Sequence, residues 1–110
     1  MDLQKDGQTE VSKEQDLALL KVLGSRGKEN DREYVKKLAY AITQAFSKHK
    51  VARLRCVGAA AVNNADKAII IASEEAKKNG IDLVERKSFT EVYFGDVKKY
   101  GILKEITASK

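Results

Sequence analysis

The sequence predicts a two-layer α/β sandwich of the α+β type, in which two helices cover one face of a four-stranded sheet. Apolar residues recur every three or four positions in two long segments, and short apolar runs or alternating patterns mark four others. Turn-forming residues separate these segments, whose order along the chain is β-α-β-α-β-β. A chain of 110 residues accommodates one such domain around a single core.

The N-terminal sixteen residues differ in composition from the rest of the chain. They contain no apolar repeat, so we interpret residues 1–16 as a disordered acidic tail ahead of a single domain at residues 17–110. The tail holds five carboxylates against two lysines, whereas the remainder holds nineteen basic against eleven acidic residues. A basic domain indicates a polyanionic partner, for which the tail is either inert or a weak competitor. Solubility alone is the alternative explanation of the charge.

The first strand and the first helix are predicted from an apolar run and an apolar repeat. Residues 17–23 form the run, which Gly24 ends. A polar loop follows, and either Asn30 or Asp31 is expected to cap the first helix. Apolar residues in 35–46 recur at three and four positions, so that this helix buries one face.

The second strand and the second helix follow at once. In residues 52–57 apolar side chains alternate with Arg53 and Arg55, which gives the strand one apolar and one cationic face. The helix is expected at about residues 60–78, and Gly80 is placed to end it. The helix is so apolar that the sheet and the first helix, or a second subunit, must cover it on more than one side.

Two longer strands close the domain, at about residues 83–94 and 100–108. The segment between them is typical of a hairpin tip and carries two lysines. Three aromatic residues flank it: Tyr93, Phe94 and Tyr100. We interpret their role as core or cross-strand packing, with stacking on nucleic-acid bases as the alternative.

The inventory of reactive residues predicts a protein without catalytic activity. The chain has one histidine and one cysteine, so no repeated Cys or His spacing exists to hold a metal, and no cofactor is predicted. His49 is expected as a cation at a helix C-terminus, and Cys56 as a small buried apolar residue. No apolar run is long enough to span a membrane, and one cysteine fits a reducing compartment, which predicts a cytoplasmic protein.

The turn between the second strand and the second helix is the strongest candidate for a binding site. Small residues lead directly from the strand into the helix, so the first N–H groups of the helix are open to an anion such as phosphate. Arg55 stands just before the turn, and Asn63 and Lys67 follow it. Asn63 and Asn64 have an alternative role, in which their amides tie the preceding loop to a neighbouring backbone.

Basic residues concentrate in three regions of the chain, and this spread suits contact with a charged polymer better than contact with one small anion. These regions are the first loop with Arg26, Lys28 and Arg32, the second strand with Arg53 and Arg55, and the hairpin with Arg86, Lys87, Lys98 and Lys99.

One segment carries a resemblance to a known family. Gly58-Ala-Ala-Ala-Val-Asn-Asn-Ala-Asp-Lys-Ala68, followed by the apolar residues 69–72, resembles the sporulation stage V protein S family. Members are small bacterial proteins related in fold to the Alba chromatin proteins. Further matches are Leu20-Lys-Val22, Gly80-Ile-Asp-Leu83 and Phe89-Thr-Glu-Val92, so that the similarity covers about residues 17–106.

The resemblance implies the β-α-β-α-β-β fold, a dimer or higher assembly, and nucleic-acid binding linked to developmental regulation. In Alba-type proteins basic loops and the hairpin arms of a dimer hold the nucleic-acid backbone. Carried over by position, the loop residues are Arg26 and Lys28, and the hairpin residues are Lys98 and Lys99.

The turn departs from the Alba pattern. Alba proteins place arginines there, whereas this chain has Gly58 and two alanines. Contact at the turn therefore falls to backbone N–H groups, with Arg55, Asn63 and Lys67 around them. Phosphate binding survives this change better than the reading of base sequence.

The combined prediction is a non-enzymatic, oligomeric protein that binds nucleic acid, DNA before RNA, chiefly through its phosphates. We expect it in the cytoplasm, associated with the nucleoid, with no membrane partner. Two alternatives stay open. One is a regulatory module that recognises another protein. The other is an RNA-binding protein, in which Arg53, Arg55 and Tyr100 serve single strands.

Overall fold

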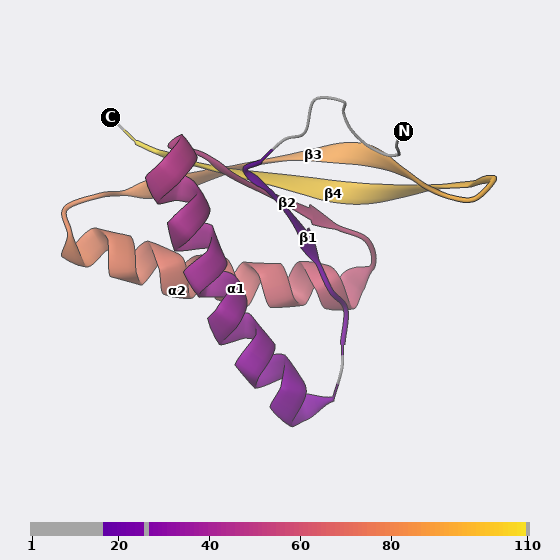
Figure 1. Ribbon diagram of the computed structural model, residues 1–110, viewed down its shortest axis with the longest axis horizontal. Coiled ribbons are helices and arrows are strands. Elements are labelled where there is room, and N and C mark those ends of the chain that lie inside the picture. The colour runs from indigo at the N-terminus through magenta and orange to yellow at the C-terminus, as the bar shows by residue number, and fades with distance from the viewer. Residues whose placement is uncertain (1–16, 26, 110) are drawn as a thin grey trace.

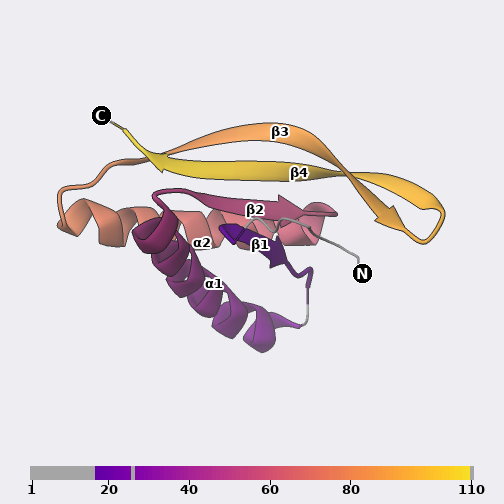
Figure 2. The ribbon, with the colours of Figure 1, turned by 45° about the horizontal axis from the view of Figure 1, so that its top comes forward.

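The computed structural model describes residues 17–25 and 27–109. The chain forms β1 (Leu19–Val22), α1 (Lys28–His49), β2 (Ala52–Cys56), α2 (Ala59–Lys78), β3 (Leu83–Phe94) and β4 (Val97–Ala108). The predicted element order is confirmed. Both helices lie on one face of the sheet, as Figures 1 and 2 show, which confirms the two-layer architecture. The tail predicted at residues 1–16 lies outside the described residues.

The four strands form one mixed sheet in the order β1-β2-β4-β3. β1 and β2 are parallel, because α1 connects them as a crossover helix, and β4 runs antiparallel to both of its neighbours. Burial alternates along β2, where Leu54 and Cys56 face the helices and Arg53 and Arg55 face the opposite side. The two-faced strand predicted from the sequence is therefore confirmed.

The core lies between the sheet and the crossed helices (Figure 2). α1 contributes its predicted stripe, including Leu38 and Ile42, to this core. α2 contributes mainly small side chains, among them Ala65, Ala68 and Ala72. Small residues on α2 let the two helices and the sheet approach closely, so a domain of this size can still bury a continuous core.

Both helices begin directly after a glycine with positive φ, Gly27 at 95° and Gly58 at 96°. The prediction that Asn30 or Asp31 caps α1 is therefore wrong. Gly27 turns the chain into the helix, and its carbonyl accepts a hydrogen bond from the Asp31 N–H at 2.7 Å. Asp31 thus lies inside the first turn, where its carboxylate accepts a hydrogen bond from Ser25 Oγ at 2.8 Å.

β3 and β4 form a hairpin with a turn of only two residues, Gly95 and Asp96. The predicted start of the last strand at residue 100 is wrong, because Gly95 has a φ of 64° and reverses the chain at once. Pairing of β2 with β4 ends at Ile102, so residues 89–102 project from the sheet as a two-stranded arm, visible in Figures 1 and 2. We call this segment the arm.

Candidate nucleic-acid interface

A cationic groove of about 390 Å³ lies between α1 and the N-terminal half of α2. Four basic residues line it: Lys28, Arg32, Lys36 and Lys67. The three from α1 are spaced four residues apart, which places them on one face of that helix. No carboxylate of the described chain forms an ion pair with any of the four. The groove therefore offers several free positive charges to an anionic ligand.

The two asparagines at the start of α2 have separate roles in this groove. Asn64 is buried, and its Nδ2 donates a hydrogen bond to the carbonyl oxygen of Leu23 at 3.2 Å. The N–H of Leu23 donates in turn to the Tyr34 hydroxyl at 2.9 Å, so that this loop is tied to both helices. Asn63 is exposed beside the cations. Asn64 therefore has a structural role, but it holds the chain after β1 and not the turn that precedes α2, whereas Asn63 is accessible to a ligand.

The site residues predicted from the sequence fall into three places. Lys28, Asn63 and Lys67 meet in the groove. Lys98 and Lys99 lie on the arm, inside β4 rather than in the hairpin turn. Arg55 lies on the open face of the sheet, where it pairs in register with Lys21 and Leu103. Arg26 is outside the described residues.

The arm carries lysines placed over aromatic rings. Lys98 Nζ lies 5.4 Å from the centre of the Tyr100 ring, and Lys99 Nζ lies 5.5 Å from that of Phe94. Tyr93, Phe94 and Tyr100 are each more than half exposed, so packing in the core is wrong for them, while cross-strand packing is compatible with the register, in which Tyr100 is the diagonal neighbour of Tyr93. The arm extends past the helices, and these rings consequently have no core to enter (Figure 1).

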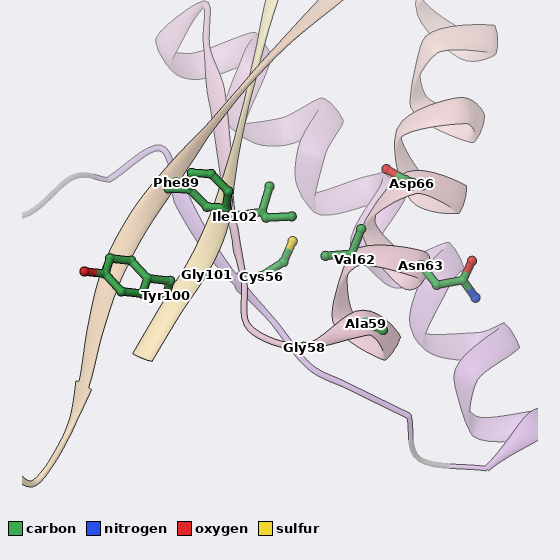
Figure 3. A pocket seen from close by; sticks show the side chains of 10 residues that line it. All are labelled: Cys56, Gly58, Ala59, Val62, Asn63, Asp66, Phe89, Tyr100, Gly101 and Ile102. Carbon is green, nitrogen blue, oxygen red and sulfur yellow. The ribbon is translucent and has the colours of Figure 1, made fainter. Parts of the chain in front are cut away.

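A second cavity, of about 500 Å³, lies beside the turn at Gly58. Figure 3 shows its two walls, with Ala59 and Val62 of α2 on one side and Phe89 and Ile102 at the base of the arm on the other. Among the described residues, no side chain caps the N-terminus of α2, as expected from the small residues at the turn. The surrounding walls are mainly apolar, which the sequence did not indicate.

A buried lysine with two carboxylate partners connects α2 to strands β3 and β4 of the sheet. Lys104 of β4 is fully buried, and its Nζ lies 2.7 Å from Asp66 of α2 and 2.9 Å from Glu85 of β3. Burial alone lowers the pKa of this lysine, but hydrogen bonds and charges from the two carboxylates outweigh it and raise the pKa above 10.5. Lys104 is therefore charged at neutral pH and links three elements.

Cys56 lies in the same part of the core and confirms the prediction of a buried thiol. Burial raises its pKa from 9.0 to about 11, although the charge of Lys104 partly opposes this effect. The thiol is protonated at neutral pH and is a poor nucleophile there. Within residues 17–25 and 27–109, no cluster of three or more His, Cys, Asp or Glu residues could hold a metal ion. Among the same residues, no helix has the length and apolarity to cross a membrane.

Comparison with protein families gives a match that covers most of the chain. The model of the family described as stage V sporulation protein S matches residues 30–109, which include both helices almost entirely and the last three strands. The fold is also consistent with the wider Alba-like superfamily. No curated protein sequence matches the chain.

Proposed function

Because the chain belongs to the stage V sporulation protein S family, we propose that this sporulation-related protein binds the phosphate backbone of nucleic acid, DNA before RNA. It acts as a homodimer or higher oligomer and without catalysis. The family is not one of known enzymes. The observation that carries the proposal is the cationic groove between α1 and α2.

The groove suits a charged polymer because its cations come from two elements and are spread along a helix face. Lys28 and Lys36 stand two helical turns apart, about 12 Å by the rise of an α-helix. Successive phosphates of one DNA strand follow the helix axis at roughly 3.4 Å, so this row spans several of them. Among the described residues that line the groove, Asp31 is the one carboxylate, and it accepts a hydrogen bond from Ser25 Oγ.

The arm supports the same proposal from a separate place. Lys98 and Lys99 follow each other in β4, so their side chains leave the arm on opposite faces. A projecting two-stranded ribbon with a cation on each face can follow a nucleic-acid groove while the body of the domain contacts the backbone.

The oligomeric part of the proposal rests on α2. Ile70 and Ile71 expose 58% and 42% of their surfaces, although they follow a buried stretch of the same helix. Neighbouring exposed isoleucines are unusual on a monomeric surface and suit contact with a second copy.

The test is a salt-titrated binding measurement on duplex DNA. Wild-type protein should bind at low ionic strength, and the logarithm of the binding constant should fall linearly with the logarithm of salt concentration. In the Lys36→Glu/Lys67→Glu variant we expect a weaker binding constant and a salt slope smaller by about 2, because each lost phosphate contact removes about 1.

The matched control is Lys37→Glu/Lys77→Glu, which changes the net charge equally at exposed positions outside the groove. It should retain most of the wild-type slope. Equal losses in both double variants would mean that net charge alone drives binding, and absence of binding at low salt would refute the proposal. Recovery of one stoichiometric protein partner with no nucleic acid would instead favour the regulatory-module alternative.

A further inference from the structure

Three aromatic rings lie in a row on the face of the arm that continues the helix side of the sheet. Phe89, Glu91 and Tyr93 alternate onto this face of β3, and their register partners in β4 are Ile102, Tyr100 and Lys98. Tyr100 is therefore the diagonal neighbour of both Phe89 and Tyr93. These three rings, which we call the aromatic strip, expose 81% (Phe89), 60% (Tyr100) and 62% (Tyr93) of their surfaces.

The polar groups along the aromatic strip are those that accompany bases and phosphates. Lys98 stands over the Tyr100 ring, and its Nζ is 3.8 Å from the Glu91 carboxylate. The Tyr93 hydroxyl donates a hydrogen bond to the same carboxylate at 3.4 Å. The strip thus offers flat π faces beside one ammonium and one carboxylate. The aromatic rings are concentrated on this surface, because the buried core of the domain consists mainly of aliphatic side chains.

We propose that the aromatic strip binds the unpaired bases of a single-stranded nucleic acid by stacking. This inference rests on the proposed function and adds to it that one ligand is a single-stranded nucleic acid. Stacking on aromatic side chains tolerates any base, while Lys98 supplies a cation for the adjoining phosphates. Glu91 can accept hydrogen bonds from the exocyclic amino groups of bases.

The spacing of the rings favours an unpaired strand over a duplex. Successive positions of the strip are two residues apart along a strand, which is about 6.7 Å. Bases within a duplex are stacked at about 3.4 Å per strand, so they present no free faces at that interval. A single strand can separate its bases and place them on consecutive rings.

The inner end of the aromatic strip opens into the cavity beside Gly58. Phe89 and Tyr100 line this cavity together with Val62 of α2 (Figure 3). Its volume of about 500 Å³ exceeds that of one base, and the backbone at Gly58 has open space beside it, since a Cβ placed there would meet no atom within 4 Å. The first base of a bound strand enters this cavity, while later bases lie outward along the arm.

The test compares an oligothymidylate with an abasic strand that has the same number of phosphates, using the full-length protein. Wild-type protein should prefer the strand with bases. In Phe89→Leu/Tyr100→Leu, which keeps apolar side chains but removes two π faces, we expect the preference to fall by roughly 5- to 150-fold for each stacked base lost. Phe89→Tyr should retain the preference, because it keeps an aromatic ring.

The matched control is Tyr40→Leu on α1, a tyrosine with 68% exposure outside the arm, which should leave the preference unchanged. Photo-crosslinking of a strand containing 5-iodouracil should label residues of the strip, and labels found only elsewhere would overturn the inference. If the double leucine variant keeps the wild-type preference for the strand with bases, the inference is also overturned. This holds even if the variant has a different oligomeric state from the wild type. Salt-dependent binding of duplex DNA would then still stand, so the two proposals fail separately.

Discussion

Lys104 occupies a position that strand alternation assigns to the core. It stands between Ile102 and Ile106 on the helix-facing side of β4 and has no exposed surface. A lysine there is tolerated because Asp66 and Glu85 satisfy its charge at hydrogen-bond distance. The alternation alone could have indicated this burial, but neither carboxylate partner is close to it in the sequence.

Replacing Lys104 with methionine should destabilise the fold by about 1–3 kcal/mol, because two carboxylates then lose their buried partner. The loss is moderated because Asp66 is half exposed and Glu85 retains Lys87 at 3.6 Å. The control is Lys87→Met, which removes an exposed partner of the same carboxylate and should cost less than about 1 kcal/mol. Denaturant unfolding measures both variants, and equal costs would contradict the role assigned to Lys104.

Stability should decline at alkaline pH because of Cys56 and Lys104. Both have a folded-state pKa above the ordinary value, about 11 against 9.0 for Cys56 and above 10.5 for Lys104. Their contributions are complete below the unfolded pKa and are lost as the pH rises through the folded pKa. We expect the free energy of unfolding to fall between pH 9 and 11, by up to about 1.4 kcal/mol per pH unit for the thiol. Cys56→Ala should remove the thiol part of this slope, and an identical slope in that variant would contradict the assignment.

At the scale of elements, the arm depends on how closely β4 crosses the end of β2. A Cβ placed on Gly101 would lie 2.6 Å from the carbonyl oxygen of Cys56. Only a residue without a side chain fits this contact, which sits where β4 leaves β2 and continues with β3 alone. A glycine inside a predicted strand indicates that another part of the backbone comes close to it. The sequence does not show that this neighbour of Gly101 is the end of β2.

Gly101→Ala should therefore destabilise the protein by about 1–3 kcal/mol, because backbone atoms must move apart. Gly24→Ala is the control, since its added Cβ would meet Ala60 at an ordinary 3.8 Å. That variant should be neutral or slightly stabilising through the lower entropy of the unfolded chain. Thermal unfolding of both variants checks the expectation, and equal midpoints would show that β2 and β4 separate at little cost.

Lys98 and Lys99 test whether the arm contacts the phosphates of a nucleic acid. Lys98→Glu/Lys99→Glu should weaken nucleic-acid binding and lower its salt slope by about 2 without unfolding the protein, because both lysines are exposed. Circular dichroism establishes the fold and a salt titration establishes the slope. An unchanged slope would exclude the arm from the phosphate contacts and leave the groove as the interface.

At the scale of the whole molecule, charge is divided between the described domain and the N-terminal residues. Residues 1–16 hold five carboxylates and two lysines, and they precede a domain in which basic residues predominate. Acidic residues attached to a cationic surface compete with an external polyanion for it.

Removing residues 1–16 should therefore strengthen binding of nucleic acid at low salt, and the gain should shrink as salt screens the charges. The shortened and full-length chains are compared in the same titration. As a control, a full-length variant with the five carboxylates replaced by amides should reproduce the gain. A gain that persists at high salt would indicate a contact other than charge.

Most of the fold could be predicted from the sequence, because periodicity is a local property. Alternation in residues 52–57 and the three-and-four repeat in α1 each depend on neighbours along the chain. The exceptions are turns, where one glycine decides the geometry. α1 begins directly after Gly27, ahead of the predicted cap, and the hairpin turn at Gly95 has two residues, fewer than predicted.

The candidate site was less predictable, because it depends on which elements meet. Lys28, Asn63 and Lys67 were candidates from the sequence, and they do meet in one groove. Lys36 was not a candidate from the sequence, and the groove includes it because residues of α1 and α2 line that groove together. Arg55 was also a candidate, but it lies on the other face of the sheet.

The sequence by itself determined the element order, the two-layer architecture and the family, since these follow from local patterns and from a continuous motif. Only the tertiary structure decided which charges share a surface and which rings are covered. Alternation assigns Phe89 and Tyr100 to the helix-facing side, but neither α1 nor α2 extends over the arm, so both are exposed. Burial depends on what packs against a face, and that contact is made between segments distant in the chain.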